Sequence, residues 1–234
     1  MTLTDLPITA VTAPITLDLY KDIHKGIRAE LFSVTAEAGR LDPSEGIARA
    51  ALATHVSDVV EMLTGHAHHE DGAIQPVLEA RLPDLAERIE VDHLTLEAHM
   101  DDLVAMAVEA AVPTVADPGA QVHRLYLALA SFTSDYLRHQ DVEERVVMPA
   151  LEAAVGIEDV VVIHQAILAS IPPQEMAKGL AVMIPAMNID DRTALLGGMR
   201  AGAPAEVFAG VWSLVGSVLD VADRGALARR LDID

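Results

Sequence analysis

Two stretches of the sequence share one polar pattern: GHAHHEDGAIQP at residues 65–76 and RHQDVEERVVMP at residues 138–149. In each stretch a His is followed four positions later by a Glu, five later by a second acid and ten later by a Pro. The two sets are His66, Glu70, Asp71, Pro76 and His139, Glu143, Glu144, Pro149. Because residues four apart share one face of an α-helix, each stretch predicts a helix that presents an imidazole beside a carboxylate.

Four long helical patterns contain or flank these stretches. Apolar residues at helical spacing begin near residue 16 and continue to Gly39, and a second pattern runs from about 44 to 79. A third begins at RLPDL (81–85) and fades at AAVPTVADPG (110–119), and a fourth opens with Asp117 as N-cap and runs to about 154. Long helices joined by short turns favour an antiparallel up-down four-helix bundle, so we predict an all-α fold.

The two ends of the chain have other patterns. Residues 1–15 contain two prolines and no basic segment, which predicts a disordered or extended lead and not a signal peptide. Residues 16–155 form the predicted bundle, and additional short helices are expected over residues 156–234, where Asn188 is a plausible N-cap. This segment is interpreted as a helical extension packed on the bundle. The alternative is a dimerisation or partner surface with four adaptable methionines: Met176, Met183, Met187 and Met199.

The composition argues against several classes of protein. A formal net charge of -20 disfavours nucleic acid and anionic membranes, because binding to phosphates depends on Lys and Arg. The chain has no Cys, which excludes disulfides, thiolate nucleophiles and Cys-ligated zinc or iron-sulfur clusters. No uncharged apolar run approaches the length of a membrane span. We therefore expect a cytoplasmic protein in which any metal is held by imidazole and carboxylate.

Two further histidines extend the candidate metal site. His24 lies on the first predicted helix and His93 on the third, so the order is His, His-x-x-x-Glu, His, His-x-x-x-Glu. This order is an approximate duplication of a helical hairpin. Four imidazoles and two bridging carboxylates would leave positions open on a pair of octahedral ions, and nitrogen and oxygen donors suit iron or manganese. Without metal, each unpaired buried charge would cost several kcal/mol.

These motifs resemble the hemerythrin-like family, also called the HHE cation-binding domain, over roughly residues 16–154. The resemblance implies a four-helix bundle that holds a non-heme di-iron centre, in which two iron ions share an oxide or hydroxide bridge and two carboxylates. Glu70 and Glu143 would be the bridging carboxylates. Carried over residue by residue, the implied ligands are His24, His66, Glu70, His93, His139 and Glu143.

The chain departs from the oxygen-carrying members of that family. Those proteins have His-x-x-x-His on the third helix and His-x-x-x-x-Asp on the fourth, whereas here Glu97 follows His93 by four positions. Glu97 could be a seventh ligand, an acid that supports a ligand, or a solvated residue. Glu144 lies five positions after His139 and competes with Glu143 for the bridging role.

Other polar residues near the motifs have weaker signals. Tyr20 and Tyr136 each lie one helical turn before a candidate ligand, so either phenol could bind or support the metal, or belong to the core. His68, His69 and Asp71 point away from the face of His66, and solvent exposure is expected for them.

The departure from the oxygen carriers favours a di-iron protein that reacts with peroxide, as a catalase- or peroxidase-like oxidoreductase, or that binds dioxygen or nitric oxide in oxidative or nitrosative stress. One alternative is an oxygen or nitric oxide sensor that signals through the C-terminal helices, and another is an iron-binding or storage protein without turnover. A ferritin-like site would need two Glu-x-x-His motifs, and only Glu90 with His93 fits. We expect a small-molecule partner, which is dioxygen, hydrogen peroxide or nitric oxide, and no nucleic acid or membrane. The chain is expected to be a monomer or a homodimer formed through its C-terminal helices.

Overall fold

The protein is all helical. The computed structural model describes residues 15–233, so the lead predicted over residues 1–15 lies outside the described residues except for Ile15. No strand occurs within that range, which confirms the all-α prediction. The chain divides into two compact units. One contains Glu30–Ser170 with the residues up to Tyr20, and the other contains Lys21–Ala29 with the residues from Ile171 onward.

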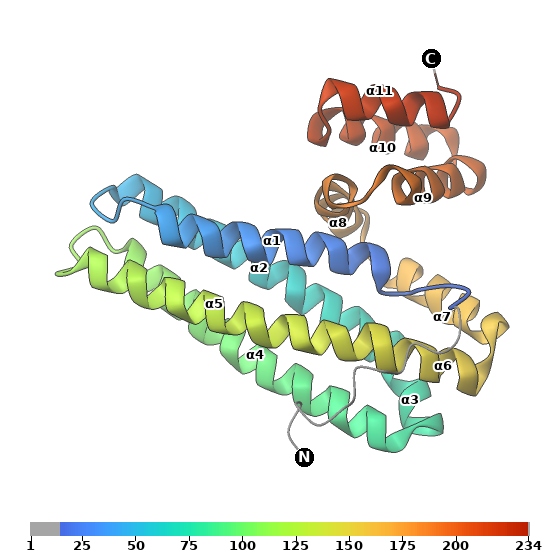
Figure 1. The fold of residues 1–234 in the computed structure, drawn as a ribbon, viewed down its shortest axis with the longest axis horizontal. Coiled ribbons are helices and arrows are strands. Elements are labelled where there is room, and N and C mark those ends of the chain that lie inside the picture. The colour runs from blue at the N-terminus through green and yellow to red at the C-terminus, as the bar shows by residue number, and fades with distance from the viewer. Residues whose placement is uncertain (1–14, 234) are drawn as a thin grey trace. The chain divides into compact units, whose positions relative to one another are not determined.

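The first unit is a helical bundle. It contains the later part of α1 (Lys21–Arg40), followed by α2 (Gly46–Ala73), α3 (Gln75–Arg81), α4 (Pro83–Ala111), α5 (Pro118–Val142), the π-helical turn η2 (Glu143–Val147), α6 (Met148–Val155) and α7 (Ile157–Ser170). The long helix α4 packs against both α2 and α5 (Figure 1). A hydrogen bond of 3.1 Å between the hydroxyls of Thr35 and Thr133 joins α1 to α5. His55 on α2 contacts two acids of α1, with 2.6 Å between its Nδ1 and Oε2 of Glu37.

Apolar side chains at helical spacing fill the bundle. Burial of each large aliphatic side chain contributes about 1.5–3 kcal/mol, which holds the helices against one another. Along α1 the expected stripe is buried, including Leu31 and Val34 at 0% exposure. Facing helices contribute Leu52, Val56, Leu63, Leu96, Leu103, Leu125 and Leu129.

The second helix is divided where a single helix over about 44–79 was expected. α2 ends at Ala73, and α3 begins at Gln75 with Pro76 in its first turn. Proline has no N–H and its ring collides with the carbonyl four residues back, so an uninterrupted helix is disfavoured here. The division places Ile74 and Leu78 in a buried apolar cluster beyond the His66–Glu70 pair.

The fourth helix contains a π-helical turn that the sequence pattern did not indicate. Asp117 is its N-cap as predicted, since its Oδ1 accepts from the backbone N–H of Ala120 at 2.9 Å. α5 then ends at Val142, and the N–H of Met148 bonds to the carbonyl of Glu143, five residues back. Pro149 follows in the first turn of α6. The π-helical turn thus lies between His139 and the proline.

The second unit is a separate group of short helices: the first turns of α1 with α8 (Pro173–Ala186), α9 (Ile189–Gly202), α10 (Ala205–Val218) and α11 (Val221–Arg230). Its own core consists of Leu180, Ile184, Leu196, Val215, Leu227 and Leu231. Asn188 caps α9 as predicted, because its side chain accepts from the backbone N–H groups of Asp190 and Asp191. Across the described residues, no helix has the length and apolarity to cross a membrane.

Candidate metal centre

The two His-x-x-x-Glu pairs lie inside the protein and form the contacts expected of one helical face. On α2, Nε2 of His66 lies 3.0 Å from Oε1 of Glu70. Nε2 of His139 on α5 lies 3.1 Å from Oε1 of Glu143, which is the first residue of the π-helical turn. In both pairs the two side chains are less than a tenth exposed. Each pair therefore presents one imidazole and one carboxylate to a buried space.

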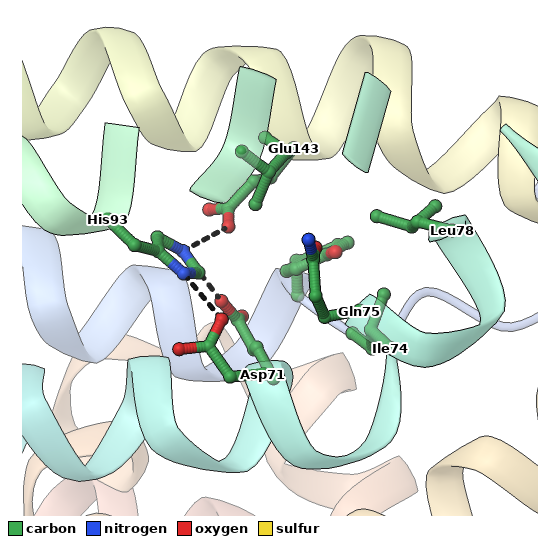
Figure 2. A pocket seen from close by; sticks show the side chains of 9 residues that line it. Asp71, Ile74, Gln75, Leu78, His93 and Glu143 are labelled. Carbon is green, nitrogen blue, oxygen red and sulfur yellow. Dashed lines mark hydrogen bonds and ion pairs between the residues drawn. The ribbon is translucent and has the colours of Figure 1, made fainter. Parts of the chain in front are cut away.

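His93 connects the two pairs. Its Nε2 lies 3.7 Å from Oε2 of Glu70 and 3.7 Å from Oε1 of Glu143. Figure 2 shows the side chains of His93 and Glu143 pointing toward each other across the cavity. α4 thus places its histidine between carboxylates that come from α2 and from the π-helical turn that follows α5.

The donor atoms form two groups that share both glutamates. Each group consists of residues whose ligand atoms all lie within 4.8 Å of one another. One group contains His24, which is fully buried on α1, with His66, Glu70 and Glu143. The other contains His93 and His139 with the same two glutamates. The structure thus brings the residues that the sequence singled out into two groups. Each group has two imidazoles of its own, and both groups share the same two carboxylates.

Burial and mutual repulsion act on the carboxylates. Glu70 is 7% exposed and Glu143 is 1% exposed. Burial raises the pKa of Glu70 well above its usual range, and the negative charge of Glu143 raises it further. Two carboxylates held this close in a buried space require positive charge beside them to remain ionised.

Burial and the neighbouring carboxylates act in opposite directions on the pKa values of the histidines. Burial by itself lowers the pKa of His93, but hydrogen bonding to Asp71 and the neighbouring Glu143 and Glu70 outweigh it and raise the pKa to about 9. The pKa of His139 is also raised to about 9, since Glu143 and Asp92 outweigh the effect of burial. In the absence of metal, protons on these imidazoles supply the positive charge that the carboxylates require.

The buried atoms of the centre that have no hydrogen-bond partner include Oε2 of Glu70 and Nε2 of His93. The 3.7 Å between them is too long for a hydrogen bond. A buried polar atom without a partner costs about 1–3 kcal/mol, so such atoms are rare in native proteins unless a ligand satisfies them. A carboxylate oxygen and an imidazole nitrogen are both ligands for divalent transition metals, and the site fits a cation of that kind.

A small cavity adjoins the donor atoms. Its volume is about 10 Å³, roughly the space of one water molecule. Its walls consist of Tyr20, Glu70, Asp71, Ile74, Gln75, Leu78, Ile89, His93 and Glu143 (Figure 2). The apolar residues among them belong to one buried hydrophobic cluster. The centre therefore has room for a small molecule of about one to two heavy atoms.

Both tyrosines named by the sequence are buried near the carboxylates. Tyr20 is 2% exposed and Tyr136 is 3% exposed. Burial raises the pKa of each phenol, and the charges of Glu70 and Glu143 raise it further. Tyr20 lines the cavity, whereas the ring of Tyr136 packs edge-on against His139 with 5.8 Å between their centroids.

Glu97 and Glu144 lie outside both donor groups. Glu97 is exposed on α4, where it lines an open hollow next to His93. Glu144 is partly buried in the π-helical turn. Of the two adjacent acids that follow His139, Glu143 is the one that faces the donors.

Asp71 is exposed as expected and His69 is partly exposed, but each also makes a contact that the sequence did not indicate. Oδ1 of Asp71 lies 2.8 Å from Nδ1 of His93, and the Asp71 side chain is half exposed at 49%. Nδ1 of His69 lies 2.8 Å from the hydroxyl of Ser170. His68 is exposed as expected. The partners of Asp71 and His69 are distant in sequence, so the local helical pattern held no signal for these contacts.

The contact with Asp71 fixes how His93 presents itself. A carboxylate that accepts from Nδ1–H keeps the proton on that nitrogen, so the lone pair of a neutral ring lies on Nε2. That nitrogen faces Glu70 and Glu143. Asp71 therefore orients a candidate metal-binding nitrogen toward the shared carboxylates.

Comparison with known proteins gives one family. The model of the hemerythrin HHE cation-binding domain matches residues 16–151, more than half of the chain and all four helices that carry the donors. Neither a curated protein nor a solved structure matched the chain. With its His and Glu groups inside the matched region, the chain belongs to the hemerythrin HHE cation-binding family.

Proposed function

We propose that the protein holds two iron ions at this centre and reacts with peroxide or binds dioxygen or nitric oxide. The observation that carries the proposal is the sharing of Glu70 and Glu143 by two donor groups, each with two imidazoles of its own. Shared carboxylates are what a pair of ions with common bridges requires. In this proposal Glu70 and Glu143 bridge the ions together with an oxide or hydroxide, and the terminal ligands are His24, His66, His93 and His139.

The donor set favours iron over a structural zinc ion. Zinc in structural sites takes four closed ligands, commonly with Cys, and this chain has no Cys. Two imidazoles and two shared carboxylates, even with a bridging oxygen, leave octahedral ions with open positions. When bound, such an iron pair supplies redox chemistry and positions for a small molecule. Manganese fits the same donors and is the metal against which iron must be tested.

The residues around the donors suit a small, weakly polar substrate. Ile74, Leu78 and Ile89 line the cavity and exclude bulk water from one side of it. We propose that Tyr20, which lines the same cavity, is an additional ligand or a hydrogen-bond donor to the bound molecule. Tyr136 holds the ring of His139 in place through its edge-on contact. Because the cavity is only about 10 Å³, dioxygen, hydrogen peroxide and nitric oxide are the substrates of the right size.

Metal analysis combined with absorption spectra tests this function. Protein produced with iron in excess is expected to contain about two iron atoms per chain and to show an oxo-to-iron charge-transfer band. Added hydrogen peroxide is then expected to release oxygen. Zinc, or no metal, would contradict the di-iron centre. A stable, reversible spectrum with dioxygen or nitric oxide and no oxygen release would favour the sensor, and two irons without either response would favour storage.

The wider expectations from the sequence join this proposal. We propose an up-down four-helix order for residues 16–155, as in other hemerythrin-like domains, and a helical extension over residues 156–234. We also propose a cytoplasmic protein that is a monomer or a homodimer formed through its C-terminal helices, without a nucleic-acid or membrane partner. Sedimentation of the purified protein tests the oligomeric part of this proposal.

A further inference from the structure

An open hollow lies on the surface of the first unit beside the metal centre. Its volume is about 290 Å³, far larger than that of the inner cavity. It is lined by Asp71, Gln75, Glu79, Glu90, His93, Leu94 and Glu97, which come from the end of α2, from α3 and from α4. All of these residues belong to the first unit, so the hollow lies within one compact unit.

The hollow and the inner cavity share three wall residues: Asp71, Gln75 and His93. The two spaces therefore adjoin at these three side chains. Figure 2 shows the three residues around the inner cavity, with the contact between Asp71 and His93 drawn. A molecule in the hollow is one layer of side chains away from Glu70 and Glu143.

The hollow has the charge of a site that attracts cations. Four of its seven wall residues are carboxylates, Asp71, Glu79, Glu90 and Glu97, and none is Lys or Arg. Wall charges of one sign in a concave surface raise the local concentration of the opposite ion and its rate of association. Apart from the pairing of Asp71 with His93, no ion pair of these acids occurs among residues 15–233.

The shared wall also offers acceptors without partners. Nε2 of His93 and Oε1 of Gln75 are both buried and have no hydrogen-bond partner. The side chain of His93 is 9% exposed, and its ring borders both spaces. The side-chain amide of Gln75 is held in place, because its Nε2 donates to the carbonyl of Ala86 at 3.1 Å. A cation that passes from the acidic hollow through this wall would therefore meet Oε1 of Gln75 and, on the inner side, Nε2 of His93, which faces Glu70 and Glu143.

We propose that this acidic hollow is the path by which a divalent cation reaches the metal centre, and that the Asp71–His93 hydrogen bond is the contact that closes it. The proposal rests on the proposed function, in which the cation is ferrous iron. The cation is first held loosely by the exposed carboxylates. Rotation of His93 away from Asp71 would open the wall, and Nε2 of the returned ring would be available to hold the cation beside Glu70 and Glu143.

Metal-association kinetics of the full-length apoprotein test this path. Cobalt(II) is the probe, since its absorption reports binding without oxidation. The test variant carries Glu79→Gln and Glu90→Gln, two exposed acids of the hollow. The control carries Asp58→Asn and Asp102→Asn, two exposed acids that do not line it. Both variants lose the same net charge, so their comparison isolates the position of the charge.

The test variant is expected to associate with cobalt about three- to tenfold more slowly than the wild type at low ionic strength, and to show a weaker dependence on salt. The control is expected to keep the wild-type rate, and all three proteins are expected to bind the same number of ions at saturation. Equal rates in the test and control variants would overturn the path but leave the metal centre standing. Failure of the wild type to bind cobalt or iron would overturn the proposed function together with the path.

Discussion

Nδ1 of His93 on α4 lies 2.8 Å from Oδ1 of Asp71 on α2, 22 positions earlier in the chain. Nε2 of the same ring faces the two buried glutamates. The imidazole therefore joins a half-exposed carboxylate to the interior of the centre. Loss of Asp71 would leave a donor that is free to rotate.

Asp71→Ala is expected to weaken metal binding about 10- to 100-fold, the usual cost of removing the partner of a metal-binding histidine. Asp71→Asn keeps an acceptor oxygen and should recover part of the affinity. Competition titrations of cobalt against a chelator measure both. His68→Ala, at an exposed position on the same helix, is the control. Equal affinities in the alanine variant and the wild type would show that Asp71 does not orient His93.

Removal of a donor is expected to lower iron content and melting temperature together. His66→Ala and Glu143→Ala each delete a proposed ligand, and bound metal stabilises the native state by about 4 kcal/mol when its free concentration is 1,000 times Kd. Elemental analysis and thermal denaturation with and without a chelator measure this. His99→Ala, on the exposed side of α4, serves as the comparison. Unchanged iron in both variants would remove these residues from the ligand set.

Arg49 is expected to stabilise the bundle without affecting the metal. It is 4% exposed and donates to three backbone carbonyls, those of Ala110 at 2.8 Å, Pro43 at 2.6 Å and Val112 at 3.3 Å. Arg49→Met leaves these acceptors without partners and should lower the free energy of unfolding by about 2–4 kcal/mol. Chemical denaturation measures the loss.

The control for Arg49 is Arg124→Met, at an exposed residue whose ion pair with Glu109 is worth about 1 kcal/mol or less. Both variants are expected to keep wild-type metal content. A drop in iron per folded chain in Arg49→Met would contradict a purely structural role.

The contacts of His55 predict a pH-dependent contribution to stability. Burial lowers the pKa of this imidazole, but hydrogen bonds to Glu37 and Glu30 outweigh burial and raise the pKa above its usual 6.5. A raised pKa means that the folded state holds the proton more tightly than the unfolded chain. The stabilisation is therefore complete below about pH 6.5 and is lost as the pH rises through the folded-state value.

His55→Gln is accordingly expected to lower the free energy of unfolding at pH 6 by about 0.5–1 kcal/mol, as for a partly exposed ion pair, and to have a smaller effect at pH 9. Urea denaturation at several pH values provides the comparison. Glu30 and Glu37, the partners of His55, lie on α1 between His24 and the end of the helix near Gly39. Metal content is therefore not expected to change. A difference from wild type that grows with pH would contradict the assignment.

The parts of the site that could be predicted from the sequence are those set by local helical geometry. His66 with Glu70 and His139 with Glu143 are four residues apart, and that spacing alone places each pair on one helical face. The two pairs approach each other once their helices pack through the helical faces that carry these residues. Burial of Tyr20, Leu31 and Val34 follows from the same periodicity.

The parts that escaped prediction depend on contacts between helices or on backbone changes. Asp71 has a local pattern that points to solvent, and only the packing of α2 against α4 gives it His93 as a partner. The division of the second helix at Ile74 and the π-helical turn after Val142 cannot be read from hydrophobic spacing, because both leave the apolar residues buried on either side. Pro76 and Pro149 indicate the regions in which the two helices are interrupted. They do not indicate that one interruption is a break at Ile74 and the other a π-helical turn.

The π-helical turn changes which side of the fourth helix the residues after it face, relative to the residues before it. His139 before the turn and Glu143 at its first position belong to the donor groups, and Met148 and Leu151 after the turn belong to the apolar cluster. In an uninterrupted α-helix, adding or removing one residue rotates everything beyond it by about 100°. Here Arg145 is an exposed residue of a five-residue turn that already accommodates one extra position. Chain length can therefore change within this turn, and the metal-binding half and the core-forming half of the helix are free to diverge separately.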